Sequence, residues 1–310
     1  MVGGDFMYSY EGLYKLLKKN NMKKSDLTIK VGISSRTIAK LSKGEKIANN
    51  VIQKICAFFN CNKDDVIKKV CDSKVLQILR DEKNAKISGG IYHETQVRLT
   101  YNSSRIEGSK LSEEQTRLIF ETNTIGIEEK TSVDDIIETV NHFRAFDFII
   151  DCAEDSLSEE IIKKIHKILK TGTKDSYLSW FNVGEYKAKR NIIGGNETTH
   201  PARVKDEMAI LLKKYLNKKK IDIKDIIEFH HDFEKIHPFQ DGNGRVGRLL
   251  CFKECLRHNI IPFIIEDSKK MFYYQGLKKW NIDQTYLIET CLDGQDMYKS
   301  LLNYFELDFE

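Results

Sequence analysis

The sequence predicts an all-α protein with one small β-hairpin. Proline occurs only three times in 310 residues, so few positions interrupt a helix. Apolar side chains recur at helical spacing through most segments, for example at Ile161, Ile162, Ile165, Ile168 and Leu169. The exception is the stretch 186–200, where short extended segments flank a glycine turn and predict a hairpin. The residues at the tip of this hairpin are Ile192, Ile193, Gly194 and Gly195.

The composition is that of an ordinary globular protein. Hydrophobic residues make up 41% and charged residues 31% of the chain, which is long enough to bury a proper core. No apolar run approaches the length of a membrane span and the N-terminus lacks a signal-peptide core, so we expect no membrane partner. The seven cysteines are odd in number and include no Cys-x-x-Cys pair. Reduced thiols in a cytoplasmic protein are therefore expected.

Charge is distributed unevenly along the chain and marks a domain boundary near residue 70. Residues 1–70 hold fourteen Lys and Arg against six Asp and Glu, which gives +8, whereas residues 71–310 carry −4. This asymmetry indicates that one end of the chain meets a polyanion, and the alternative is a solvated lysine-rich face. We predict a first domain over 1–70, a connecting helix or linker over 71–90, and a larger domain over 91–310.

The basic N-terminal segment is expected to hold four short helices. Ser25 and Ser34 stand where side-chain oxygens can cap the second and third helix, and Gly32 supplies the turn between these two. Two short helices joined around a glycine form the helix-turn-helix pattern. The four helices are predicted over residues 13–20, 25–29, 35–42 and about 50–59.

The stretch SDLTIKVGISSRTIAKLSKGEKI in this segment resembles the Cro/C1-type DNA-binding domain, and the resemblance covers roughly residues 8–70. It implies that the third helix enters the major groove of DNA. A small helical bundle that serves protein contacts or dimerisation is the alternative. The residues that would face base edges or phosphates are Ser35, Arg36, Thr37 and Lys40.

The densest chemistry of the chain lies between His237 and Arg248. Within the stretch HPFQDGNGRVGR, Pro238 ends one helix and the glycines lead into the next. A helix N-terminus presents unpaired N–H groups and partial positive charge, and glycines let a phosphate approach the backbone closely. Arg245 and Arg248 share a helix face near that end, where they can clamp phosphates while Asp241 holds Mg²⁺. His237 is suited to take a proton from a hydroxyl near pH 7.

This stretch resembles the signature of the Fic family, His-Pro-Phe-x-Asp/Glu-Gly-Asn-Gly-Arg-x-x-Arg, at every specified position. The resemblance extends over about residues 90–310 and implies a Fic helical core with a β-hairpin flap. Fic proteins mostly transfer AMP from ATP to a Ser, Thr or Tyr hydroxyl of another protein. The resemblance implies His237 as the catalytic base and Asp241 as the Mg²⁺ ligand. The residues that it places around the nucleotide are Phe239, Gly242, Asn243, Gly244, Arg245 and Arg248.

One position bears on the type of reaction. Doc-type relatives, which phosphorylate their targets, carry a lysine where this chain has Gly244. The resemblance therefore favours AMP transfer over phosphorylation, with ATP as co-substrate and a target protein, or the chain itself, as acceptor. Removal of AMP or transfer of another nucleoside monophosphate by the same site stays open. Two further alternatives stay open. The chain can be a DNA-binding regulator whose Fic domain senses a nucleotide, and it can form a homodimer.

The stretch from Ser103 to Gly108 resembles the inhibitory Ser/Thr-x-x-x-Glu-Gly/Asn motif that precedes the core in many Fic proteins. It implies an inhibitory helix near residues 98–108, in which Ser103 and Glu107 act on the site. Glu107 would pair with Arg248, which takes the arginine away from the γ-phosphate and repels the charge of the nucleotide. An ordinary glutamate at a helix end is the alternative.

Two further segments resemble parts of the Fic core. The hairpin over 186–200 resembles the flap that Fic proteins lay over the site, and its strand edge can pair with an extended target segment. Lys187 stands where arginine is common in the family. The stretch with Tyr273, Tyr274 and Asn281 resembles the segment near the adenine, where an aromatic ring lines the base and an amide reads its edge. A structural hairpin and a helix with a Tyr/Leu face are the alternatives.

Overall fold

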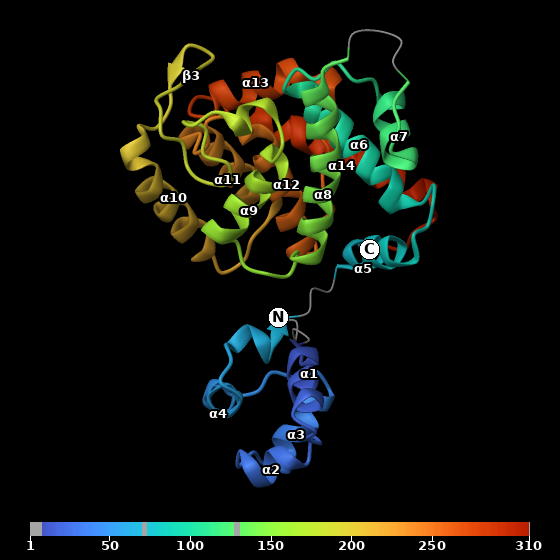
Figure 1. The fold of residues 1–310 in the computed structure, drawn as a ribbon, viewed down its shortest axis with the longest axis vertical. Helices are drawn as coiled ribbons and strands as arrows, with labels where there is room; N and C mark the ends of the chain where they lie inside the picture. The colour runs from blue at the N-terminus through green and yellow to red at the C-terminus, as the bar shows by residue number, and fades with distance from the viewer. Residues whose placement is uncertain (1–7, 70–72, 127–130, 310) are drawn as a thin grey trace. The chain divides into compact units, whose positions relative to one another are not determined.

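The computed structural model describes residues 8–69, 73–126 and 131–309, and it divides the chain into two compact units, 1–72 and 73–310. Both units are built of helices, and each carries one two-stranded antiparallel sheet in its described part (Figure 1). The predicted all-α fold with a small hairpin is confirmed. Among the described helices, none combines the length and the apolar composition that crossing a bilayer requires.

In its described part, the first unit packs four α-helices around an apolar core. Its elements are β1 (Tyr8–Ser9), α1 (Glu11–Lys19), α2 (Asp26–Lys30), α3 (Ser35–Ser42), α4 (Asn49–Phe59), the 3₁₀ helix η1 (Lys63–Asp65) and β2 (Lys68–Lys69). All four helices contribute buried side chains to one cluster, and β1 pairs with β2. The helix side chains of this cluster include Leu13, Leu17, Leu27, Leu41, Ile52 and Ile55.

The capping predictions for this unit are half right. Ser34 caps α3, because its Oγ accepts a hydrogen bond of 3.2 Å from the Thr37 N–H. Ser25 makes no such bond at α2, so that prediction is wrong. The turn before α2 is held instead by Asp26, whose Oδ2 accepts a hydrogen bond of 2.7 Å from the Lys23 N–H.

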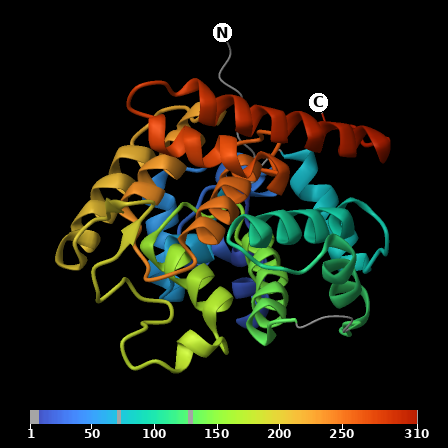
Figure 2. The ribbon, with the colours of Figure 1, turned by 90° about the horizontal axis from the view of Figure 1, so that it is seen from above.

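The second unit is the larger one, and Figure 2 shows it from above. Its first elements are α5 (Lys74–Ala85), α6 (Ile91–Ile106), α7 (Glu113–Thr122), α8 (Val133–Asp151), α9 (Glu159–Lys170), the 3₁₀ helix η2 (Lys174–Tyr177), β3 (Ile192–Ile193) and β4 (Asn196–Glu197). They are followed by α10 (Pro201–Leu216), α11 (Ile223–Ile236), α12 (Asn243–Arg257), the 3₁₀ helix η3 (Asp267–Lys269), α13 (Lys270–Lys279) and α14 (Thr285–Tyr304).

Helix α12 is the centre of this unit. It packs against α6, α8, α9 and α11, which surround it. Every residue from Asn243 to Leu256 is buried, as expected for a helix enclosed on all sides rather than on one stripe. Since the predicted phosphate-binding residues lie in the first turns of α12, the surrounding helices fix the position of the site.

Helix α5, which the sequence presents as a connector, belongs to the second unit. Its Arg80 donates a hydrogen bond of 2.9 Å to the Ile150 carbonyl near the end of α8. The amphipathic pattern of α5 therefore reflects a face packed on the larger unit rather than a free linker. The buried side chains of this face are Val75, Leu76 and Leu79.

Candidate functional site

The loop from His237 to Gly242 connects α11 to α12 and sets the geometry of the site. Helix α11 ends at Ile236, since Pro238 disfavours helical backbone at the residue before it. His237 adopts a left-handed conformation (φ 52°) that residues other than glycine rarely take. Gly242 has φ 81° and directly precedes α12. The loop thus leads to the N-terminus of a buried helix, whose unpaired N–H groups attract an anion.

Two contacts close this loop from the inside. The Asn243 side chain accepts a hydrogen bond of 2.8 Å from the Phe239 N–H and donates one of 2.9 Å to the Phe239 carbonyl. The buried Phe239 ring stacks on His166 of α9, with ring centroids 4.0 Å apart and planes 5° apart. The sequence places Asn243 at the phosphates, but its side-chain amide holds the loop backbone. Its main-chain N–H is what it can offer to an anion.

His237 has the properties of a general base. The residue is buried, and this burial together with the nearby Lys187 lowers its pKa to about 4. The imidazole is therefore neutral at pH 7 and able to accept a proton. The Lys187 N–H donates a hydrogen bond of 2.9 Å to the Pro238 carbonyl, which fastens one end of the hairpin beside this histidine.

The hairpin presents an open strand edge. Ile192 pairs with Glu197 across the turn, and the Ile192 and Ile193 side chains are exposed. At the base of the hairpin, the buried Lys187 ammonium donates a hydrogen bond of 3.0 Å to Asn191 Oδ1. Burial lowers the pKa of Lys187 to about 8. The predicted hairpin is present, with Gly194 and Gly195 at its turn, and its role as a docking flap stays a proposal.

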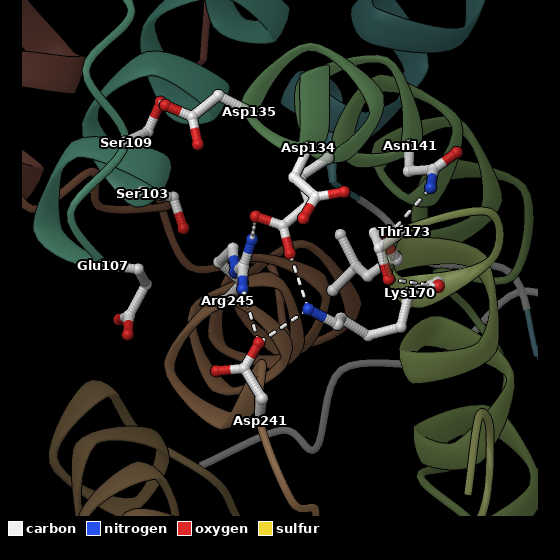
Figure 3. A network of polar contacts seen from close by, with 12 residues as sticks. Ser103, Glu107, Ser109, Asp134, Asp135, Asn141, Lys170, Thr173, Asp241 and Arg245 are labelled. Atoms are coloured by element: carbon white, nitrogen blue, oxygen red, sulfur yellow. Dashed lines mark hydrogen bonds and ion pairs between the residues drawn. The ribbon is translucent and has the colours of Figure 1, made fainter. Parts of the chain in front are cut away.

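Four charged side chains form a closed ring at one side of the loop, in which cations and anions alternate. Lys170 at the end of α9 lies 2.6 Å from Glu138 and 2.7 Å from Asp241. Arg245 completes the ring, because one of its arms pairs with Glu138 and the other lies 3.2 Å from Asp241. Figure 3 shows Lys170, Asp241 and Arg245 turned toward one another. Both guanidinium arms of Arg245 are thus engaged by carboxylates.

This ring keeps Asp241 ionised. Burial opposes its charge, yet Arg245 and Lys170 hold the pKa of Asp241 well below its usual range. Among the described residues, no three His, Cys, Asp or Glu side chains gather into a metal cage. Mg²⁺ often binds through a single carboxylate together with substrate phosphates and water. The half-exposed Asp241 carboxylate, with both ion pairs on Oδ2, fits that pattern through its Oδ1.

On the other side of the α12 N-terminus, Arg248 is held by α6. Its Nη2 lies 2.8 Å from Glu107 Oε1 and donates a hydrogen bond of 2.9 Å to the Ser103 carbonyl. Its Nε donates a further bond of 2.9 Å to Ser103 Oγ. The predicted inhibitory helix is longer than expected: α6 starts at Ile91, and Glu107 is the residue directly after its last turn.

The Glu107 carboxylate lies against the backbone of the first turn of α12. A Cβ atom added at Gly244 would lie only 2.1 Å from Glu107 Oε1. The carboxylate is therefore placed where the helix N-terminus and Arg248 both attract negative charge. An anion bound at this point would have to share the position with a negative side chain.

The three residues expected near the adenine lie in different surroundings. Tyr273 is buried, and its hydroxyl contacts His230 Nε2 at 2.8 Å and Arg248 at 3.4 Å. The Tyr274 hydroxyl donates a hydrogen bond of 2.9 Å to the Ile106 carbonyl at the end of α6. Asn281 is exposed in the turn after α13, and no hydrogen bond of its side chain is seen within the described residues. The structure thus brings both tyrosines to the Arg248 side of the site and does not tie Asn281 to it.

Sequence reasoning missed the residues behind the loop. The His166 ring accepts a hydrogen bond of 2.9 Å from the Gly184 N–H at Nδ1, so Nε2 donates to the Asp241 carbonyl at 3.2 Å. Burial and Lys170 lower the pKa of His166 to about 3. The available signal was the spacing of His166 and Lys170, four apart on one face of an otherwise isoleucine-rich helix. Nothing in the sequence indicated that Glu138 of α8 faces them.

A second missed group lies behind Arg248. Burial and the negative charge of Glu107 raise the pKa of Glu234 to about 8, against the opposing charge of Arg248. Burial and Arg248 lower the pKa of His230 to about 3. Both groups are therefore largely uncharged at pH 7, which leaves Glu107 as the carboxylate that pairs with Arg248.

In the first unit, the residues assigned to DNA lie at the start of α3. Ser35 and Arg36 are exposed, whereas Thr37 and Lys40 are half-buried. The Thr37 hydroxyl is engaged with the N-cap serine at 3.0 Å, and Lys40 lies 4.0 Å from Glu45. Ser35 and Arg36 are thus the most accessible of the four.

Comparison with known families confirms both resemblances. Residues 156–254 match the model of the Fic/DOC family, and residues 13–72 match that of the Cro/C1-type HTH DNA-binding domain. The first range contains the whole loop and most of α12. The chain carries a Fic domain and a helix-turn-helix domain.

Several curated relatives are named protein adenylyltransferase Fic. The one from Drosophila erecta is 28% identical over 189 residues, which cover 58% of this chain and 36% of the relative. The one from Aedes aegypti is 28% identical over 229 residues, which cover 71% of this chain and 42% of the relative. The chain therefore spans less than half the length of these relatives.

Solved structures show the same fold. A Fic domain-containing signaling protein from Bacteroides thetaiotaomicron gives a TM-score of 0.60 at 23% identity, covering 75% of this chain and 92% of that chain. A fragment of Fic-1 from C. elegans gives a TM-score of 0.60 at 20% identity, covering 96% of this chain and 85% of that chain. The second unit therefore has the helical core expected of a Fic domain.

Proposed function

We propose that this protein is a protein adenylyltransferase, which transfers AMP from ATP to a hydroxyl side chain of a target protein. The observation that carries the proposal is the arrangement of one loop: a neutral, buried imidazole stands at one end, and a helix N-terminus with two arginines stands at the other. The named activity of the relatives supports the same reaction.

In the proposed reaction, the hydroxyl oxygen of the target attacks the α-phosphorus of ATP while the bond to the bridging oxygen breaks and pyrophosphate leaves. His237 takes the hydroxyl proton. The backbone at Gly242 and Gly244 and the guanidinium groups of Arg245 and Arg248 hold the phosphates in line for this attack. Mg²⁺, when bound by Asp241 together with the phosphates, supplies part of the charge neutralisation.

We further propose that Glu107 is a brake on this reaction. Its contact with Arg248 and its position against Gly244 place negative charge at the point where the outer phosphates would bind. As long as the carboxylate stays there, it repels the nucleotide and withholds Arg248 from it. This arrangement supports an enzyme with low basal activity.

The test compares ATP radiolabelled on the α-phosphate with ATP radiolabelled on the γ-phosphate, in the full chain with Mg²⁺. Glu107→Gly should raise self-labelling or target labelling from α-labelled ATP by roughly tenfold or more, the size of a typical coupling between two sites. His237→Ala in the same background should lower labelling by about 10²–10⁴-fold, the usual contribution of a general base.

Each outcome has a distinct meaning. Label from the γ-phosphate would point to phosphorylation instead. Loss of AMP from a pre-labelled target, faster in wild type than in Glu107→Gly, would favour the reverse reaction. Equal labelling of wild type and Glu107→Gly, with His237→Ala silent, would refute the brake and leave the transferase intact.

For the first unit we propose DNA binding, because its helix-turn-helix domain has a basic balance and exposes Arg36 at the start of α3. Binding of the full chain to duplex DNA should weaken as salt rises, since phosphate contacts release counterions. Arg36→Ala should weaken binding and reduce the slope of log K against log salt by about one. Salt-independent binding, or no binding at low salt, would exclude this role.

A further inference from the structure

The side chain that contacts Asp241 most closely is itself a buried cation. Lys170 is only 2% exposed, and its ammonium group lies 2.7 Å from Asp241 Oδ2. The same ammonium group lies 2.6 Å from Glu138 and 3.7 Å from Asp175, so it stands among three carboxylates. Figure 3 shows the Lys170 chain extending from α9 toward Asp241.

The position of Lys170 is fixed by several independent contacts. Its own carbonyl accepts a hydrogen bond of 2.9 Å from the Thr173 hydroxyl. Asn141 of α8 donates hydrogen bonds of 3.0 and 2.8 Å to the Leu169 and Thr171 carbonyls on either side. One turn earlier on α9, His166 donates to the Asp241 carbonyl at 3.2 Å. The end of α9 therefore contacts both the backbone carbonyl and the carboxylate of Asp241.

Both ion pairs of Asp241 end on the same oxygen. Lys170 and Arg245 contact Oδ2, while 49% of the Asp241 side chain remains exposed. A divalent cation at this carboxylate meets a resident ammonium group, which is buried and is held in place by Glu138 and Asp175 as well. Two cations at one carboxylate repel each other.

We propose that Lys170 is a positioning residue that competes with the metal for Asp241, so that Mg²⁺ binds weakly to the empty site and firmly only when nucleotide phosphates supply further ligands. Glu138 has the opposite effect to Lys170. It pairs with the Lys170 ammonium group and with Arg245, so the Asp241 carboxylate is less fully neutralised and attracts the metal more strongly. The site thereby admits the metal together with its nucleotide. This inference rests on the proposed adenylyltransferase function and on Mg²⁺ as its metal.

The arrangement predicts shifts of opposite sign for two substitutions in the same ring. Lys170→Met removes the competing charge and should tighten Mg²⁺ binding roughly tenfold. Glu138→Gln removes an anion and should weaken it by a similar factor, because Lys170 and Arg245 then act on Asp241 alone. Damage to the fold would weaken binding in both variants, so the opposite signs distinguish competition from structural loss.

The experiment is a calorimetric titration of Mg²⁺ into the full chain, without nucleotide and with saturating non-hydrolysable ATP analogue, in the Glu107→Gly background. Lys170→Arg is the matched control, since it keeps the charge and should stay within about threefold of the parent. Asp241→Asn is the reference for loss of the metal ligand. The largest gain from Lys170→Met is expected without nucleotide.

The outcomes separate the two proposals. If Asp241→Asn binds Mg²⁺ as well as the parent does, the metal site of the proposed function fails and this inference falls with it. If Asp241→Asn loses Mg²⁺ while Lys170→Met binds no more tightly than the parent, competition by Lys170 is wrong and the proposed function stands. If Lys170→Met does not fold, the change in Mg²⁺ affinity of Glu138→Gln decides. Tighter or unchanged Mg²⁺ binding in that variant overturns the inference.

Discussion

Arg245 and Arg248 lie one turn apart on α12 and are equally buried, yet their carboxylate partners are held in different ways. Arg245 is locked between Asp241 and Glu138, which Lys170 also bridges. Arg248 pairs with one carboxylate, that of Glu107, the residue just after the end of α6.

Of these two similar ion pairs, only the one at Arg248 can open easily enough to work as a switch. Opening the Arg245 ring separates several charges at once inside the protein, and each separation costs free energy. Opening the Arg248 pair requires one carboxylate at a helix end to turn toward solvent, since the remaining contacts of Arg248 come from Ser103 and Tyr273. The first arginine therefore belongs to the framework, and the second is the one that a brake can release.

The largest effect should come from acid, because neutral histidines surround both arginines. Burial, aided by nearby positive charge, lowers the pKa values of His142, His166 and His230 to about 3 and that of His237 to about 4. These values lie below the ordinary value of about 6.5, so the unfolded chain binds more protons and stability falls as the pH falls. Each of these four histidines contributes a loss of about 1 kcal/mol between pH 6 and pH 5. Glu234, whose raised pKa acts in the opposite direction, offsets about one of them, so the second unit should lose about 4 kcal/mol.

Fluorescence of Trp180 and Trp280 during denaturant unfolding measures this loss in the second unit alone, since both tryptophans lie there. The first unit offers an internal control. Residues 1–70 contain no histidine, so its helix signal should change little over the same pH interval. A second unit equally stable at pH 5 and pH 6 would show that these histidines are not held neutral.

The next largest effect separates the two arginines. Arg245→Met leaves two carboxylates with one cation between them and should cost about 3–5 kcal/mol of unfolding free energy. Arg248→Met leaves Glu107, which can turn to water, and should cost about 1–3 kcal/mol. Arg98→Met, at a half-exposed pair with Glu94, is the matched control and should cost about 1 kcal/mol or less. If Arg245→Met and Arg248→Met lose equal unfolding free energy, the proposed difference between a framework arginine and a switch arginine is wrong.

A third prediction tests whether Glu107 rests on the helix N-terminus. Gly244→Ala places a methyl group 2.1 Å from Glu107 Oε1, so the carboxylate must move. We expect a loss of about 1–2 kcal/mol in wild type and a smaller loss in the Glu107→Gly background, a coupling measured by a double-mutant cycle. Gly126→Ala, where an added Cβ meets open space and φ is not positive, controls for the general cost of alanine at a glycine position.

The sequence predicted those features of the site that local chemistry determines. Pro238 ends α11 and the glycines lead into α12, because the proline restricts the residue before it and Gly242, directly before the helix, adopts positive φ without cost. The pairing of Glu107 with Arg248 was expected from the resemblance of two short motifs. In these cases the signal lies within a few residues of the feature it predicts.

The features that the sequence could not predict depend on packing between distant elements. Lys170 of α9 reaches Asp241, and Glu138 of α8 reaches Lys170 and Arg245, only because their helices enclose α12. Asn243 looked like a phosphate ligand, but its amide closes the loop around the Phe239 backbone. Periodicity shows that a helix face is buried and says nothing about which charged groups meet there.

The smallest predicted effect concerns the tether that holds the end of α6. The Tyr274 hydroxyl donates to the Ile106 carbonyl at 2.9 Å, directly before Glu107. Tyr274→Phe removes this bond and should cost about 1 kcal/mol of stability. Because the freed helix end lets Glu107 leave Arg248 more often, labelling from α-labelled ATP should rise about two- to fivefold, well below the effect of Glu107→Gly.

Tyr286→Phe is the matched control, since within the described part of the chain its hydroxyl makes no hydrogen bond, and its ring contact with the Lys279 ammonium group does not depend on the hydroxyl. Labelling and unfolding should both stay at the wild-type level in that variant. If Tyr274→Phe lowers stability without raising labelling, the end of α6 does not govern the position of Glu107. The carboxylate would then be released by its own rotation, and the switch would be a side chain rather than a helix end.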